Sequence, residues 1–222
     1  MAQPFHDIAS QYDFLNDVLS LGLHRIWKKK LVNALLNLRP HPSKVLDLAT
    51  GTGDVAALFA KTVSEGSVIP VDPCPAMMEQ GKKRFPHLKN WTVGSAETLP
   101  FPNESISLVT CTFGIRNFQK RLQGFQEIAR ILEPGGLFGI LEIHPIPKKL
   151  AYWPFRVFWE HFVPKIGAFF QKRQAYEYLR DTGARFISAE DMVEELSSQF
   201  ELIQMKSILA GGLVSLVILQ KR

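Results

Sequence analysis

Glycines and acids are spaced along residues 45–72 as in a ligand-binding loop. An apolar run contains Asp47 and is followed by Gly51, Thr52 and Gly53. Glycine adopts positive φ angles without strain, so the backbone can turn sharply there and approach a ligand closely. The stretch predicts a buried strand, a tight loop and a helix whose first N–H groups face an anionic group of the ligand.

The acids decide which ligand this loop favours. Asp72 lies about twenty residues after the glycines, at the position of a ribose-binding acid, and this spacing alone permits NAD. Asp54 directly follows the second glycine and Asp47 lies in the strand that points to the same crevice, so both carboxylates would repel a pyrophosphate. S-adenosylmethionine carries a sulfonium and an ammonium group, and the same acids would attract it.

A second polar turn follows the third predicted strand and consists of Ser95, Ala96 and Glu97. Small residues and an acid at the end of a strand could hold the amino group of adenine. The same residues could equally form a plain turn between a strand and a helix, because short motifs of this kind often occur without a ligand.

Strands and helices alternate through the core, which predicts an α/β fold with a doubly wound, mostly parallel sheet whose ligand lies at the carboxyl ends of the strands. The expected core strands are 45–48, 67–71, 91–93, 106–112 and 137–143. The expected core helices are 54–63, 75–85 and 119–132, preceded by amphipathic helices over 5–19 and 24–38. A helix over 188–197 and an antiparallel pair of strands, 200–207 and 213–219, close the sheet and give about seven strands.

The chain has 222 residues, 46% of them hydrophobic, which is enough for a single domain. We divide it into an N-terminal helical segment, a cofactor-binding core, a helical insert and a C-terminal helix with a strand pair, over residues 5–43, 44–144, 148–183 and 184–222. Eight aromatic residues fall between positions 151 and 170, so the insert is either a lid over the carboxyl edge of the sheet or ordinary core.

Several motifs together are more specific than the loop alone. They are the loop, Ser95–Glu97, Pro134–Gly136, Tyr12–Asn16, Ser20, Gly22–Lys28, Phe113–Asn117, Pro164–Gly167, Ala175–Leu179 and Ala210–Gly212. The set resembles the class I S-adenosylmethionine-dependent methyltransferases, and within them the UbiE-type quinol C-methyltransferases. The resemblance runs from about Phe5 to the C-terminus, so it covers nearly the whole chain.

This resemblance implies a Rossmann-like fold and C-methylation of a prenylated quinol, either demethylmenaquinol first or the benzoquinol of ubiquinone synthesis. It maps the S-adenosylmethionine contacts onto Thr52, Asp72, Ser95, Ala96 and Thr112. With the loop residues added, the expected cofactor-binding set is Asp47, Gly51, Thr52, Gly53, Asp72, Ser95, Ala96 and Thr112. Two departures from the family pattern are Ser95, where the family usually has Asn, and His144, where it has Ser.

A quinol ring carbon becomes nucleophilic when a ring hydroxyl loses its proton, so the site needs a group that stabilises a phenolate or takes the proton. Arg116 follows the fourth strand and is our first choice for stabilising the phenolate, although it could instead form a structural ion pair with an acid. Asn117 could position the same oxygen or cap the next helix. Tyr12 could contact the substrate or belong to the apolar stripe of its helix, and His24 could handle a proton or cap its helix.

The remaining features bound the partners and the location. The net charge of +5 alone requires neither nucleic acid nor membrane, and no RNA-recognition motif is evident, so we expect no nucleic-acid partner. Tyr152–Phe170 is the candidate for a peripheral membrane contact, with Lys28–Lys30 as a second option, and a homodimer is left open. The two cysteines and six histidines lack metal spacing, so we expect no metal, and without a secretory signal we expect a cytoplasmic protein.

Two rival functions remain from the sequence. One is a methyltransferase of the same fold with another small acceptor. The other is a non-catalytic protein that binds the cofactor or RNA. At a finer level, Asp13 is expected to form an ion pair with Arg25.

Overall fold

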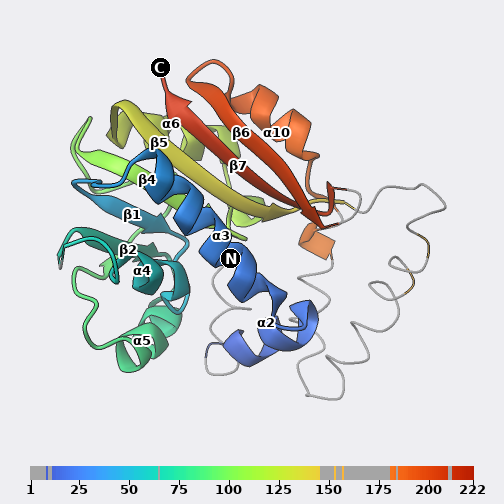
Figure 1. Ribbon diagram of the computed structural model, residues 1–222, viewed down its shortest axis with the longest axis horizontal. Helices are drawn as coiled ribbons and strands as arrows, with labels where there is room; N and C mark the ends of the chain where they lie inside the picture. The colour runs from blue at the N-terminus through green and yellow to red at the C-terminus, as the bar shows by residue number, and fades with distance from the viewer. Residues whose placement is uncertain are drawn as a thin grey trace.

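A seven-stranded sheet in the order β3-β2-β1-β4-β5-β7-β6 forms the centre of the computed structural model (Figure 1). The structure describes residues 9, 12–64, 66–145, 153, 157, 181–183, 185–209 and 212–222. All neighbouring strands are parallel except that β7 runs antiparallel to both β5 and β6. The predicted α/β architecture, mostly parallel with an antiparallel end, is confirmed.

The strands are β1 Val45–Leu48, β2 Val68–Asp72, β3 Thr92–Val93, β4 Ile106–Thr112, β5 Leu132–Ile143, β6 Phe200–Leu209 and β7 Val214–Lys221. The helices are α2 Tyr12–Ser20, α3 Leu23–Leu38, α4 Asp54–Phe59, α5 Pro75–Arg84, α6 Arg121–Ile131 and α10 Ala189–Leu196, with a single 3₁₀ turn, η1, at Ile115–Asn117. Most of the predicted insert, residues 148–183, lies outside the described residues, so the role of this insert as a lid stays a prediction. The turn at Ala210 and Gly211 also lies outside them.

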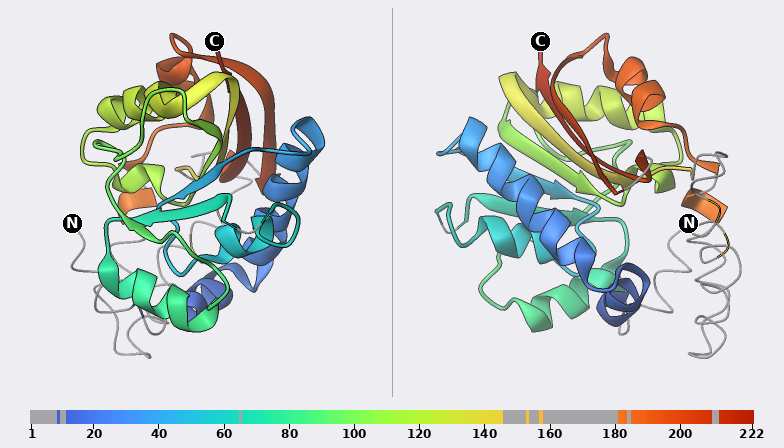
Figure 2. Two further views of the ribbon diagram at one scale, coloured as in Figure 1. Left: turned by 90° about the vertical axis from the view of Figure 1, so that its left-hand side faces the viewer. Right: turned by 45° about the vertical axis from the view of Figure 1, so that its right-hand side comes forward.

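Helices cover both faces of the central strands, most of whose residues are buried, whereas β6 at the edge of the sheet is largely exposed. Figure 2 places α3 and α4 on one face and α6 and α10 on the other. The first face buries Leu31 and Leu35 of α3 with Phe59 of α4. The second buries Phe125 of α6 and Met192 of α10. The central strands are thus covered on both faces, and a ligand can approach them at the carboxyl edge of the sheet.

The order of the strands reverses beside β1. From β1 the chain continues outward to β2 and β3, then returns to place β4 on the other side of β1. Asp47 of β1 therefore lies between Pro70 of β2 and Thr110 of β4 in the register of the sheet. A crevice opens at such a switch point, at the carboxyl ends of the strands, and this position fixes where the functional residues must be sought.

Several element boundaries differ from the prediction by one or two residues, and the larger differences are at α4 and β5. Helix α4 ends at Phe59, because the chain after it forms turns in which the hydroxyl of Thr62 donates to the Phe59 carbonyl at 3.1 Å. Helix α6 begins only at Arg121. Strand β5 begins at Leu132 and includes the predicted Pro-Gly-Gly break, which the ladder to β4 accommodates as an irregularity in register.

The N-terminal helices pack against each other near the carboxyl edge. The expected ion pair between Asp13 and Arg25 is wrong, because Arg25 pairs with Asp17, one helical turn closer to the corner, at 2.6 Å. Within the part of the chain that the structure describes, no helix is both long enough and apolar enough to cross a bilayer.

The loop glycine Gly53 provides a test of this fold. It has φ of +86°, and a Cβ there would lie 2.7 Å from Trp91 Cη2, whereas Gly66 has φ of +88° with nothing within 4 Å. We expect Gly66→Ala to lower the free energy of unfolding by about 1–2 kcal/mol from backbone strain alone. Gly53→Ala should cost about 1–3 kcal/mol more from overpacking. Urea unfolding measures both, and equal losses would contradict the close approach of Trp91.

Candidate active site

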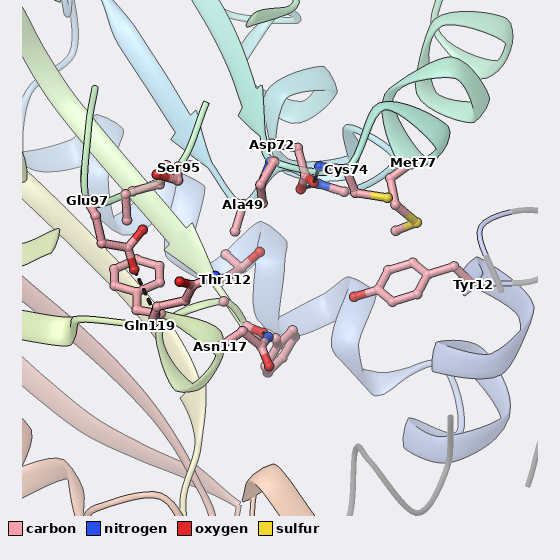
Figure 3. A pocket seen from close by; sticks show the side chains of 17 residues that line it. Tyr12, Ala49, Asp72, Cys74, Met77, Ser95, Glu97, Thr112, Asn117 and Gln119 are labelled. Carbon is pink, nitrogen blue, oxygen red and sulfur yellow. Dashed lines mark hydrogen bonds between the residues drawn. The ribbon is translucent and has the colours of Figure 1, made fainter. Parts of the chain in front are cut away.

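A cavity of about 260 Å³ opens at the switch point (Figure 3). Its walls come from the segments that follow β1, β2, β3 and β4, with Tyr12 of α2 and Met77 of α5 completing it. Its volume is slightly below the roughly 300–1,000 Å³ that ligand pockets occupy. The cavity therefore lies where the topology of the sheet predicts a ligand.

The cavity brings together part of the predicted site. The predicted residues that line it are Gly51, Asp72, Ser95, Ala96, Thr112, Tyr12 and Asn117. The predicted residues that do not line it are Asp47, Thr52, Gly53, Arg116 and His24. Apart from Tyr12 on α2, the first group lies at or after the carboxyl ends of strands. The second group lies outside the lining, and Asp47, Thr52 and Arg116 in it have their side chains bonded to other residues.

Asp72 has a carboxylate at the cavity wall that is held by the backbone. Its Oδ2 accepts from the N–H of Gly51 and its Oδ1 accepts from the N–H of Cys74, both at 2.8 Å. Each oxygen keeps acceptor capacity, as a ribose with two hydroxyls requires. Burial raises the pKa of Asp72 to about 6, although the two backbone hydrogen bonds oppose this rise.

Asp47 is buried and connects four elements. Its Oδ2 accepts from the Thr50 hydroxyl at 2.6 Å and from the N–H of Ala56 at 3.1 Å, and its Oδ1 accepts from the Thr110 hydroxyl at 2.8 Å. Burial raises its pKa to about 6, against the hydrogen bonds from the two threonines. Asp47 therefore fixes the loop and the start of α4 relative to β1 and β4, without lining the cavity.

The loop satisfies several of its own N–H groups, which the sequence argument had assigned to a ligand. The N–H of Gly51 donates to Asp72, that of Gly53 to the Thr50 carbonyl at 2.9 Å, and that of Ala56 to Asp47. These three groups are thus donors within the protein. The two acids that accept from them order the loop that surrounds the cavity.

The electrostatic argument against a pyrophosphate rests on different residues from those expected. Asp54 forms ion pairs with Lys28 at 2.9 Å and with Arg84 at 2.8 Å, so its charge is compensated. Among the described residues that line the cavity, Asp72 and Glu97 are acids and none is Lys or Arg. An anionic lining still favours a cationic ligand, but Asp72 and Glu97 provide it in place of Asp47 and Asp54.

Arg116 forms a buried ion pair, which is the structural alternative that the sequence left open. Its Nη1 donates to Glu142 Oε1, and the two side chains are 5% and 0% exposed. The backbone N–H of Arg116 also donates to Glu142 at 3.3 Å. Its Nε is buried and has no hydrogen-bond partner among the residues that the structure describes.

Asn117 lines the cavity and does not cap the following helix. Its side-chain amide donates to the Phe113 carbonyl at 3.5 Å. The N–H groups of Gln119 and Lys120, just before α6, instead donate to Glu97 at 2.7 and 3.2 Å. Glu97 therefore joins the third and fourth walls of the cavity.

His24 is a neutral, buried histidine whose tautomer follows from its neighbours. The hydroxyl of Ser20 donates to the Asn16 carbonyl at 2.6 Å, so at 2.8 Å it must accept from His24 Nδ1. The Nε2 atom is then an acceptor without a proton, and it is buried with no hydrogen-bond partner in the described part of the chain. Burial, followed by the charge of Lys28, lowers the pKa of His24 to about 4. The residue at the N-cap of α3 is Gly22, so the capping role proposed for His24 is wrong.

His144, a departure from the family pattern, has both ring nitrogens engaged. They contact the Ile187 carbonyl at 2.8 Å and the Ser215 hydroxyl at 2.6 Å. The second contact joins the residue after β5 to β7. Within the described ranges, no three His, Cys, Asp or Glu side chains gather as metal ligands would.

Sequence reasoning did not single out the cavity residues Cys74, Met77, Phe118 and Gln119. Cys74 and Met77 come from the segment after β2, directly behind Asp72, and Phe118 and Gln119 follow Asn117. Adjacency to a predicted strand end is the signal that could have identified them. Their apolar contacts give no distinctive residue pattern.

The comparisons with known proteins agree with this geometry. The model of the ubiE/COQ5 methyltransferase family matches residues 1–219. A Rickettsia bellii protein named ubiquinone/menaquinone biosynthesis C-methyltransferase UbiE is 35% identical, with 96% of this chain and 88% of that protein covered. A Photorhabdus laumondii protein of the same name is 32% identical, with 97% and 88% covered.

A solved Thermotoga maritima structure has a similar fold. It is described as a SAM-dependent methyltransferase, possible histamine N-methyltransferase, and gives a TM-score of 0.70 at 19% identity over the whole of both chains. The family match implies S-adenosylmethionine as the cofactor, and the solved structure shows the same fold.

The raised pKa of Asp72 predicts how cofactor binding depends on pH. Below pH 6 the carboxyl gains a proton, and an oxygen that must accept becomes a donor. We expect the affinity for S-adenosylhomocysteine, measured by calorimetry, to fall by about tenfold per pH unit below that value. Asp72→Asn should bind weakly at every pH. A dependence that survives in Asp72→Asn would assign the titration to another group, with Asp47, whose pKa is also raised to about 6, as the first candidate.

The buried pair of Arg116 and Glu142 predicts a coupled loss of stability. Either Arg116→Met or Glu142→Gln leaves its partner without compensation, so each should lower the free energy of unfolding by about 3–5 kcal/mol. The double variant should lose much less than the sum of the two. Urea unfolding of all four proteins completes the cycle. Additive losses would mean that the two side chains do not interact.

Proposed function

The chain belongs to the ubiE/COQ5 methyltransferase family, and we propose that it transfers a methyl group from S-adenosylmethionine to a ring carbon of a prenylated quinol in quinone biosynthesis. Demethylmenaquinol is our first choice of acceptor, and the benzoquinol of ubiquinone synthesis is the second. The observation that carries the proposal is the single cavity that joins Asp72 and Ser95 to Tyr12 and Asn117.

The residues around the cavity suit the cofactor. The buried carboxylate of Asp72 offers acceptors for ribose hydroxyls, and Ser95 and Ala96 lie one strand away, where the adenine would be held. The acidic lining favours the positive charge of the sulfonium. When bound, S-adenosylmethionine supplies a methyl group already activated for displacement, so the protein contributes mainly positioning and control of charge on the acceptor.

The acceptor would lie between Tyr12 and Asn117. In Figure 3 the hydroxyl of Tyr12 points into the cavity from α2, across from Ser95 and Glu97, and Asn117 borders the same space. A hydroxyl and an amide are suited to hold a ring oxygen as it becomes a phenolate. Arg116 is the residue before Asn117 in the chain. Its ion pair with Glu142 offsets much of its charge, so we assign it only a supporting part in stabilising the phenolate.

Direct assay of the purified protein tests this function. We expect transfer of labelled methyl from S-adenosylmethionine to a ring carbon of reduced demethylmenaquinol, detected by mass spectrometry. Asn117→Ala should lower kcat by about a hundredfold, because one donor to the developing phenolate is lost. Its affinity for S-adenosylhomocysteine should change little.

Asn33→Ala, which removes an exposed amide on α3, is the control and should behave as the wild type. Transfer to the benzoquinol alone would select the second acceptor. Cofactor binding without transfer to either quinol would refute the proposed reaction.

A further inference from the structure

A single carboxylate on α2 contacts two segments that contribute residues to the cofactor cavity. Asp13 Oδ1 accepts from the hydroxyl of Thr52 at 2.7 Å, and Asp13 Oδ2 accepts from Arg84 Nη1 at 2.6 Å. Thr52 belongs to the loop after β1, next to Gly51, which lines the cavity. Arg84 is the last residue of α5, the helix that contributes Met77. One side chain of α2 therefore connects that helix to the loop and to α5 together.

This contact continues into a chain of alternating charges. Arg84 Nη1 also contacts Asp54 at 2.8 Å, and Asp54 contacts Lys28 of α3 at 2.9 Å. Burial would raise the pKa of Asp54, but the ion pairs with Lys28 and Arg84 outweigh it and lower that pKa. The two anions and two cations compensate each other. Arg84, which binds Asp13, is thus held in place through Asp54 of α4 and Lys28 of α3.

Apolar contacts lie directly beside the ionic ones. Ala9 and Tyr12 pack with Cys74 and Met77 in one small cluster. Tyr12, Cys74 and Met77 all line the cavity. Tyr12 precedes Asp13 in the chain, so the position of the Asp13 carboxylate also sets where the Tyr12 ring lies.

We propose that Asp13 is a positioning residue, which holds α2 against the loop and α5 so that Tyr12 closes the cavity and slows release of the cofactor. Thr52, which the family resemblance assigned to cofactor contact, acts here through Asp13. The inference rests on S-adenosylmethionine as the cofactor and is independent of the identity of the methyl acceptor.

The chain offers a matched control for an ordinary ion pair. Arg121 and Glu195 join α6 to α10 with an N···O distance of 2.6 Å and side chains 29% and 28% exposed. Arg84 and Asp13 show the same distance, 2.6 Å, with side chains 31% and 27% exposed. The two pairs are alike in length and exposure, and none of their four residues lines the cavity. They differ in that Asp13 also accepts from Thr52 of the loop after β1, whereas Arg121 and Glu195 join only α6 to α10.

Release of radiolabelled S-adenosylhomocysteine after rapid dilution tests the proposal, with the thermal midpoint measured on the same samples. Asp13→Asn keeps the shape of the side chain but loses the charge-assisted hydrogen bonds, so the dissociation rate should rise by about tenfold. Glu195→Gln should leave that rate unchanged. Added salt should speed release from the wild type and have less effect on Asp13→Asn.

Each outcome decides the question. A wild-type release rate in Asp13→Asn, or an equal increase in Glu195→Gln, would overturn the positioning role. If Asp13→Asn does not fold, Arg84→Met tests the same link from α5 with the same expected increase. If Asp13→Asn releases the cofactor faster but the wild type methylates neither quinol, the role of Asp13 is supported and the proposed acceptor is refuted. The two failures are therefore distinguishable.

Discussion

The buried carboxylate of Asp47 is the constraint on which the site depends. It sits at the switch point of the sheet, opposite Thr110 in the β1–β4 register, and accepts hydrogen bonds from that residue, from Thr50 and from the N–H of Ala56. A buried carboxylate is costly unless such bonds compensate it. Because its partners come from a strand, a loop and a helix start, they cannot move independently. The loop is fixed where the cavity opens.

Asp72 repeats this arrangement one strand away, but at the cavity wall. It accepts from the N–H groups of Gly51 and Cys74 and still has acceptor capacity for a ligand. Asp47 shapes the loop from behind, whereas Asp72 shapes it and also borders the ligand. The acidic character that favours a sulfonium thus comes from Asp72 and Glu97, while Asp54 is compensated by Lys28.

The sequence predicted the parts of the structure that periodicity and position determine. The bounds of β1 and β4 agree with the prediction, and Ser188 caps α10 as expected, accepting from the N–H of Asp191 at 3.1 Å. Asp72 and Thr112, which were expected as cofactor contacts at the strand ends, line the cavity.

Side-chain direction and long-range pairing were not accessible in the same way. Periodicity places Asp47 and Arg116 on their elements. It does not show that Asp47 is hydrogen-bonded to buried threonines or that Arg116 forms a buried ion pair with Glu142. The link from Asp13 to Arg84 spans 71 residues and has no local signal. The acids of the loop motif were therefore interpreted as ligand contacts, although some of them, such as Asp47, bond within the protein and hold the loop in place.

Calorimetric titration of S-adenosylhomocysteine into Asp47→Asn tests the central claim most directly. The asparagine keeps the volume of the side chain but places an amide donor toward the N–H of Ala56, or loses the acceptor for Thr110. We predict a loss of affinity of about tenfold or more in a folded protein, although Asp47 does not line the cavity. An affinity equal to that of the wild type would contradict the account, because the loop would then keep its position without this carboxylate.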